Sequence, residues 1–174
     1  MTRDQLPALF SEAEIRARVQ EMARAISAMH DTPEIALPIL VGGFVFAADL
    51  LRALHACGVS LPVEFLQLRS YGDKREAGGE IRVLIGPGEN VRGRHVLLID
   101  GVLDRGRTLV SARDLAISAG ARAVTSAVAI DKRRSGAVLT ADFAAFTRVA
   151  HFVVGYGMDD AGRLRALPYI AAVG

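Results

Sequence analysis

The sequence predicts an α/β protein with a mostly parallel sheet that is covered by helices on both faces. Short runs of apolar, often β-branched residues alternate along the chain with longer stretches of helical periodicity, which is typical of such sheets. Polar and glycine residues gather where three of the apolar runs end, at 40–43, 100–108 and 131–132. Ligands of parallel sheets bind beyond the carboxyl ends of the strands, so these three ends are the first candidates for a site.

The first third of the chain predicts two helices around one strand. Residues 10–30 form an amphipathic pattern, and Ser11 followed by Glu14 is a capping box at its start. The run "IALPILVG" at 35–42 is typical of a buried strand. A second helix is expected over 44–58, closed by its final glycine, and Cys57 near its end is expected to be buried.

The middle of the chain predicts a strand pair followed by a strand, a helix and a strand. The run at 62–71 alternates imperfectly, which favours burial on both faces, and the polar, glycine-bearing segment 72–80 is expected to be a mobile loop. The segments that continue the pattern are strand 81–86, strand 95–100, helix 107–120 and strand 123–130.

The last third of the chain is less regular. Segment 131–150 has no clear periodicity, whereas 151–157 and 169–174 are expected to be short strands. No linker, internal repeat or low-complexity tract divides the chain, so its 174 residues are expected to form one domain, 1–174.

Composition argues against several classes of protein. The net charge is only +2, which gives no electrostatic argument for nucleic acid binding despite the basic isoelectric point. A single cysteine allows neither an internal disulfide nor a cysteine metal cluster. The start of the chain lacks the apolar core of a signal peptide, and the longest apolar run is too short and interrupted to cross a membrane. A cytoplasmic protein without a membrane partner is therefore expected.

The junction "HVLLIDGVLDRGRTLVSARDL" at 95–115 joins a strand to a helix, with the two acids Asp100 and Asp104 and two glycines between them. Backbone N–H groups at the helix start, with Gly106 allowing close approach and Thr108 adding a hydroxyl, predict an anion site. Acids repel phosphate, so Asp100 and Asp104 indicate a ligand that also carries hydroxyls or a proton to be removed. A sugar phosphate that reacts at its other end satisfies both demands. In the simpler alternative, Asp104 only caps the helix and Gly106 only turns the chain.

Four segments resemble the type I phosphoribosyltransferase family, and within it the hypoxanthine-guanine branch. "VLLIDGVLDRGRTL" at 96–109 resembles the phosphoribosyl diphosphate signature, and "ILVGGFVFAADLL" at 39–51 resembles the pyrophosphate loop with its helix. "SYG" at 70–72 is similar to the start of the mobile active-site loop, and "FVVGYGMDDAGRLRALPYI" at 152–170 to the purine-site motif. The resemblance runs from about residue 10 to the end. It implies a family fold with a small hood built from the termini, and a dimer or tetramer.

The resemblance also implies a reaction and a set of roles. A 5-phosphoribosyl group would pass from phosphoribosyl diphosphate to a 6-oxopurine, hypoxanthine or guanine, in purine salvage with Mg²⁺. Asp104 would be the general acid or base at purine N7. The resemblance implies phosphoribosyl binding by Asp100, Gly101, Arg105, Gly106, Arg107 and Thr108. It implies pyrophosphate binding by Leu40, Val41, Gly42, Ser70, Tyr71 and Arg165. It also implies purine binding by Lys132, Phe152, Val153 and Asp159, and Mg²⁺ binding by Asp100 and Asp159.

Each of these residues has a plainer interpretation without the family. Lys132 lies in "DKRR", which is typical of a solvated turn, and Phe152 could be an ordinary core residue. Asp159 and Arg165 could be surface charges.

Two positions depart from the family pattern in the signature. Gly101 stands where the family has a second acid, and Arg105 stands where it has threonine after the catalytic acid. Three interpretations follow: an active 6-oxopurine enzyme, a nucleotide-binding regulator that is catalytically weak or inactive, and an enzyme for another acceptor base. If Gly101 is a simple loss, restoring an acid there is expected to tighten binding of the donor.

Overall fold

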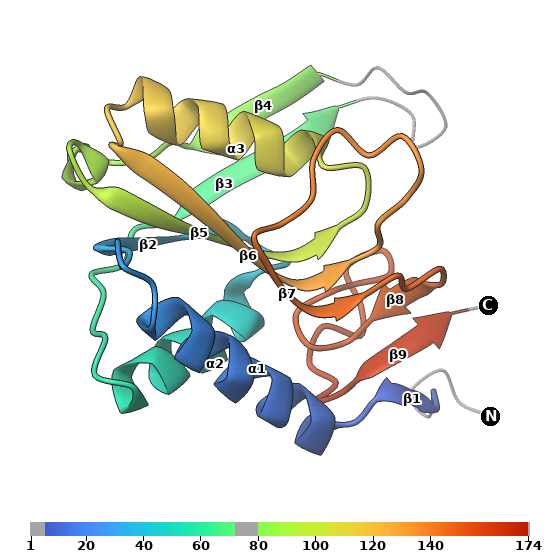
Figure 1. The fold of residues 1–174 in the computed structure, drawn as a ribbon. Helices are drawn as coiled ribbons and strands as arrows, with labels where there is room; N and C mark the ends of the chain where they lie inside the picture. Colours follow the sequence, from blue (N-terminus) through green and yellow to red (C-terminus); the bar gives the residue numbers. More distant parts are fainter. Residues whose placement is uncertain (1–5, 72–79, 174) are drawn as a thin grey trace.

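A computed structural model of the chain describes residues 6–71 and 80–173, and it leaves the side chains of Ser70, Tyr71 and Glu80 undescribed. The predicted mobile segment 72–80 therefore lies almost entirely outside the described residues. The order along the chain is strand, helix, strand, helix, two strands, a short 3₁₀ helix, strand, helix and four strands. Figure 1 shows a large sheet between helices and a small sheet at one side.

The large sheet has six strands in the order β4-β3-β2-β5-β6-β7. All neighbouring pairs are parallel except β3 with β4, so the mostly parallel sheet that the sequence predicts is confirmed. The strands are β2 (Ile35–Leu40), β3 (Leu66–Tyr71), β4 (Glu80–Ile85), β5 (His95–Leu103), β6 (Ala123–Asp131) and β7 (Phe143–Thr147).

The termini build a second, antiparallel sheet in the order β1-β9-β8. Its strands are β1 (Ala8–Phe10), β8 (Phe152–Val154) and β9 (Ile170–Val173). Both described ends of the chain lie beside it in Figure 1. This is the hood that the resemblance implies, and it stands next to the carboxyl ends of β5 and β6.

Helices cover both faces of the large sheet, as predicted (Figure 1). One face carries α1 (Glu12–Ser27) and α2 (Phe44–Ala56), and the other carries α3 (Arg107–Ser118); η1 is a 3₁₀ turn (Glu89–Val91). Two clusters of buried hydrophobic residues fill the space on either side of the sheet. Burial of these side chains is the main source of stability in such a layered fold.

The predicted capping box at the start of α1 and the predicted glycine at the end of α2 are both confirmed. The Ser11 side chain accepts from the Glu14 N–H and the Glu14 carboxylate accepts from the Ser11 N–H, which is the capping box. Gly58 adopts a φ of +85° just after α2, a backbone conformation that glycine adopts without steric cost. None of the helices in the described residues is long and apolar enough to cross a membrane.

Several predictions about elements are wrong. Strands β1 and β7 were not expected, and both depend on partners far away in the sequence: the ring of Phe10 stacks on that of Phe146, with 3.8 Å between centroids. Val63 and Phe65 are 40% and 48% exposed rather than buried on both faces, because β3 begins only after them. Cys57 is exposed, because it follows the last helical residue of α2.

Candidate active site

The loop from β5 to α3 forms the floor of a small cavity. β5 continues three residues beyond its predicted end at Asp100, because Val102 and Leu103 still pair with β6. Gly106 then turns with a φ of +86° and α3 begins. The cavity of about 260 Å³ is lined by Asp100, Val102, Leu103, Asp104, Arg105, Gly106, Arg107, Thr108 and Leu109. Every residue predicted for the phosphoribosyl loop lines it except Gly101.

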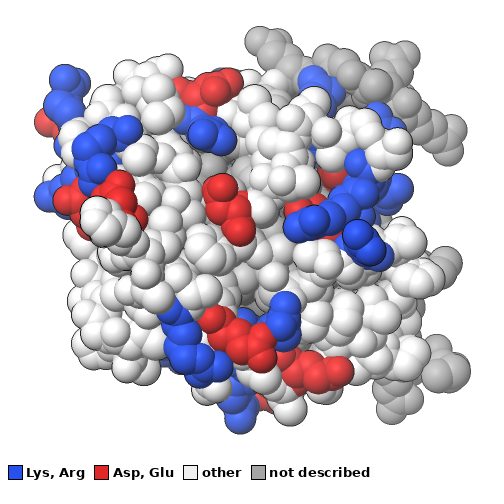
Figure 2. Space-filling model, viewed as in Figure 1, with Lys and Arg blue, Asp and Glu red and all other residues white. Residues whose placement is uncertain are grey.

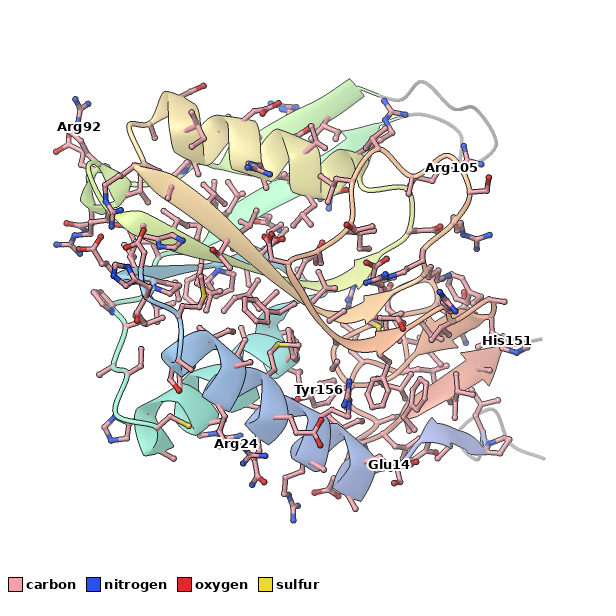
Figure 3. All side chains as sticks on the ribbon, viewed as in Figure 1. Glu14, Arg24, Arg92, Arg105, His151 and Tyr156 are labelled. Carbon is pink, nitrogen blue, oxygen red and sulfur yellow. The ribbon has the colours of Figure 1, made fainter. Side chains whose placement is uncertain are left out.

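The first turn of α3 follows directly on this loop, and the N–H groups of a helix N-terminus are suited to bind anions. The positive φ of Gly106 requires glycine, and a Cβ there would press on Val138 and Leu139. Arg105 and Arg107 are exposed at the loop, and Arg105 is labelled beside the start of α3 in Figure 3. The geometry therefore fits a phosphate group held largely by backbone.

Asp100 is half-buried, and its carboxylate accepts from the N–H of Gly101 at 2.7 Å. Loss of solvation raises the pKa of Asp100 to about 7, although the Gly101 hydrogen bond pulls in the opposite direction. A carboxylate in this state gains from a ligand that supplies a donor or a cation.

Asp104 faces Lys132 across the carboxyl ends of β5 and β6. The Nζ of Lys132 lies 3.8 Å from Oδ2 of Asp104, and the lysine is only 7% exposed. Burial lowers the pKa of Lys132, while the neighbouring Asp104 carboxylate opposes that shift. The plain interpretation of "DKRR" as a solvated turn is therefore wrong for Lys132.

The ring of Phe152 lies below the same ammonium group, with its centroid 6.0 Å from Nζ of Lys132. Phe152 is 52% exposed, which contradicts its plain interpretation as an ordinary core residue. Val153 is buried and pairs with Ala172 in the hood. The structure thus brings Asp104, Lys132 and Phe152 together as a carboxylate, an ammonium and an aromatic face.

Three glycine-bearing segments meet at one carbonyl. A Cβ placed on Gly101 would lie 2.7 Å from the carbonyl oxygen of Gly42, and a Cβ on Gly157 would lie at the same distance from it. The predicted pyrophosphate loop after β2 therefore rests directly on β5 and on the hood. We call Gly42, Gly101 and Gly157 the glycine junction.

The other residues predicted to bind pyrophosphate lie in different parts of the structure. Leu40 ends β2, Val41 follows it through a cis peptide bond, and Val41 is 43% exposed. Ser70 and Tyr71 end β3, where only their backbone is described.

Arg165 is not at the phosphate cavity. It donates to the Gly157 carbonyl at 2.7 Å and pairs with Asp159 at 2.8 Å, so the two predicted side chains contact each other. The second Asp159 oxygen accepts from the Gly162 N–H at 2.6 Å.

Sequence reasoning assigned no role to three residues at the site, although Asp131 lies at one of the three strand ends that it singled out. Gly157 belongs to the junction, Arg134 forms an ion pair with Asp104, and Asp131 is fully buried beneath the loop that carries Arg134. The signal for Asp131 was available, since an acid directly after a long apolar strand needs partners when it is buried. Neither of the other two contacts has a local sequence signal.

Comparison with known proteins gives consistent matches. A family model described as "Phosphoribosyl transferase domain" matches residues 11–161. The chain is 34% identical to the hypoxanthine-guanine phosphoribosyltransferase of Bacillus subtilis, with 99% of this chain and 96% of that protein covered. It is 32% identical to the enzyme of that name from Dictyostelium discoideum, over 93% of this chain and 92% of that one.

Solved structures agree in fold. A hypoxanthine phosphoribosyltransferase from Staphylococcus aureus has a TM-score of 0.88 and 26% identity, with 98% of this chain and 92% of that chain covered. A hypoxanthine phosphoribosyl transferase from Trypanosoma cruzi, studied for the role of its C-terminal region in oligomeric state and activity, has a TM-score of 0.87 and 28% identity, covering 100% and 94%.

Proposed function

The chain belongs to the phosphoribosyltransferase family, and from that premise we propose that it transfers the 5-phosphoribosyl group from phosphoribosyl diphosphate to a 6-oxopurine. The products are a nucleoside monophosphate and pyrophosphate, which is a purine salvage reaction. The single observation that carries the choice of base is the pairing of Lys132 with Asp104 over Phe152.

That pairing matches one edge of a 6-oxopurine. The O6 atom of such a base is an acceptor and lies next to N7 on the same edge. Lys132 offers only donors to O6, and Asp104 offers an acceptor for a proton on N7. Phe152 presents a ring on which the base stacks, with its remaining edge toward the backbone of Val153.

The sugar and its phosphate belong in the cavity between β5 and α3. The 5′-phosphate takes the N–H groups from Arg105 to Thr108, and Asp100 accepts from the ribose hydroxyls. The leaving pyrophosphate lies toward Leu40, Val41 and Gly42, whose backbone follows β2. Ser70, Tyr71 and Arg165 complete this group in the proposal, although Arg165 must release Asp159 or act through it.

Mg²⁺ fits the acids that are present. Among the described residues no cluster of three or more metal-binding side chains occurs, and Mg²⁺ is usually held by one or two carboxylates together with substrate phosphates. Asp100 would provide one carboxylate and Asp159 the second. When bound, the ion offsets negative charge that grows on the pyrophosphate.

The chain's own residues then have defined tasks in the reaction. The bond between ribose C1′ and pyrophosphate breaks while N9 of the purine bonds to C1′, and the N7 proton passes to Asp104. Lys132 and Phe152 orient the base, and the helix N-terminus fixes the other end of the sugar. Fixing both ends aligns the attacking nitrogen with C1′.

We also propose that the protein forms a homodimer or homotetramer, as the family resemblance implies. A groove of about 870 Å³ separates α1 and α2 from the chain after β8, and its walls mix apolar and charged side chains, among them Val19, Ala53, Tyr156, Arg165 and Leu167. Tyr156, labelled in Figure 3, hydrogen-bonds to Asp49 at 2.7 Å in this groove. Light scattering after gel filtration measures the mass directly.

Nucleic acid remains an unfavoured partner. The face in Figure 2 carries separate mixed groups of basic and acidic side chains with uncharged surface between them. A continuous basic stripe is the usual footprint of a nucleic acid site.

The decisive experiment is a pyrophosphate-release assay with phosphoribosyl diphosphate, Mg²⁺ and hypoxanthine, guanine, xanthine or adenine in turn. Release with a 6-oxopurine and none with adenine is the expected result. Nucleotide binding without any release would favour the regulator over the enzyme. Omitting Mg²⁺ tests the metal separately.

A further inference from the structure

Arg134 contacts the carboxylate of Asp104, which accepts the N7 proton in the proposed reaction. The Nε of Arg134 forms an ion pair with Oδ1 of Asp104, while Oδ2 of Asp104 faces Nζ of Lys132 at 3.8 Å. Oδ1 is closed off from solvent and accepts no hydrogen bond from the described residues, so Arg134 acts on it through charge alone; the Asp104 side chain as a whole is 48% exposed. The exposed part of this carboxylate is therefore on the Oδ2 side.

The loop that carries Arg134 is tied to the end of β6 by a buried side chain. Asp131 is fully buried at the end of β6, and its two oxygens accept from the N–H groups of Arg133 at 2.9 Å and Ala141 at 3.3 Å. One side chain thereby ties together both ends of the loop 132–141. Burying a carboxylate costs free energy unless it accepts hydrogen bonds. The hydrogen bonds from Arg133 and Ala141 therefore hold the loop in this conformation.

The same loop folds back onto the phosphoribosyl loop. The N–H of Val138 donates to the carbonyl of Arg105 at 3.1 Å, and the N–H of Ala137 donates to the carbonyl of Arg134 at 3.0 Å. Val138 and Leu139 also pack against Gly106. Arg134 is thus carried by a segment that is attached to the loop between β5 and α3.

We propose that Arg134 is a positioning residue for proton transfer, which holds Oδ1 of Asp104 and so makes Oδ2 the atom that receives the N7 proton. This inference rests on the proposed function. An aspartate carboxylate rotates broadly about its last bond, and two cations on different oxygens restrict that rotation. Oδ2 then stays beside Lys132, where O6 and N7 of one base meet their separate partners.

The first test compares Arg134→Gln with Arg134→Lys in steady-state kinetics. Loss of the ion pair is expected to lower kcat about 10-fold, between the few-fold effect of an exposed pair and the ~10²-fold cost of a misplaced group. KM for both substrates should stay within about 2-fold, because ground-state binding is untouched. Arg134→Lys keeps the charge and should recover part of kcat.

Arg92→Gln is the matched control, because it removes one positive charge at the end of the molecule opposite Arg105 (Figure 3). Its kcat should equal that of the unmutated protein. An Arg134→Gln enzyme with unchanged kcat overturns the inference, as does a lysine variant no better than glutamine. A raised KM for phosphoribosyl diphosphate with unchanged kcat also overturns it and assigns Arg134 to the donor.

A double-mutant cycle tests whether Arg134 acts through Asp104. In the Asp104→Asn background, Arg134→Gln should cause no further loss of kcat, because the group that it positions is gone. Independent, multiplying effects of the two substitutions would overturn the inference. Turnover by the unmutated protein tests the proposed function itself, whereas ratios between variants test Arg134, so the two failures are distinguishable.

Discussion

The end of the candidate site that we propose for the base and the end that we propose for the sugar phosphate are built in different ways. At the base end, side chains from three separate segments converge: Asp104, Lys132 and Phe152, with Arg134 behind them. At the sugar-phosphate end, most of the surface is backbone, namely the first turn of α3 and the loop after β2 packed against Gly101. Side-chain substitutions should therefore change base choice sharply, whereas the sugar-phosphate end should respond mainly to added volume.

This difference explains why the two departures from the family pattern fall where they do. Arg105 is exposed, and the position contributes its backbone to the loop, so a longer side chain can point outward. Gly101 has no room for a side chain while Gly42 stays in place. Neither change touches the three convergent side chains at the base end.

The largest expected effect is that of Asp104→Asn at the base end. Loss of the proton acceptor should lower kcat by ~10²–10⁴. Binding of the nucleoside monophosphate, measured by calorimetry, should be nearly unchanged because the amide keeps the shape of the carboxylate. Turnover equal to that of the unmutated protein would return Asp104 to a helix-capping role.

The next largest effect is expected for Lys132→Ala. A buried ammonium cannot find an acceptor on the 6-amino group of adenine, and the cost of that lost partner can reach several kcal/mol. The unmutated protein should therefore reject adenine, and the variant should lose most of this discrimination along with affinity for oxopurines. The ratio of kcat/KM for hypoxanthine and adenine measures it, with Arg92→Gln as control.

Gly101→Ala and Gly101→Asp sharpen the comparison at the other end. The sequence alone predicts that an acid at position 101 tightens donor binding. The structure predicts the opposite, because the Cβ of any residue at 101 would lie 2.7 Å from the Gly42 carbonyl oxygen. Both variants should weaken donor binding and lower stability by ~1–3 kcal/mol, a cost typical of overpacking. Thermal melts and KM for phosphoribosyl diphosphate report the two effects.

The alanine variant separates volume from charge at this position. If aspartate binds the donor more tightly than both alanine and glycine, the loop after β2 yields and Gly101 is a true loss. If both variants are similarly impaired, the close packing is the reason for glycine.

The smallest expected effect is a pH dependence from Asp100. Its pKa lies near 7 in the folded protein and at an ordinary acidic value in the unfolded chain, so the stability contributed by its protonated form is present in acid and is lost as the pH rises through about 7. Asp100→Asn stays neutral and should show a smaller fall in Tm between pH 5 and pH 8. Asp114→Asn, exposed on α3, is the control, and parallel curves for all three proteins would contradict the assignment.

The sheet, its helices and the hood could be predicted because their signals are local or carried by the family resemblance. Apolar runs and capping patterns belong to single segments, and the capping box from Ser11 to Glu14 needs only four residues. β1 and β7 could not be predicted in this way. Each is short, and each depends on pairing and on the stack between Phe10 and Phe146, which lie far apart in the sequence.

The same limit applies to the site. The positions of Asp104 and Lys132 at neighbouring strand ends follow from strand order, because parallel neighbours end at one edge of a sheet. The ion pair of Arg134 depends on how the loop 132–141 folds back, and the hydrogen bonds of Asp131 to Arg133 and Ala141 stabilise that conformation. The contact between Gly42 and Gly101 depends on packing of the loop after β2 against strand β5 to within an atom's width.

The glycine junction bears on how this protein could change over time. One carbonyl oxygen fills the space that a side chain at 101 and a side chain at 157 would each need. A single substitution of Gly101 by an acid places the new Cβ against that oxygen. Two adjacent acids at 100 and 101 therefore require the segment around Gly42 to shift as well, so one substitution alone does not give the two-acid pattern in the present backbone.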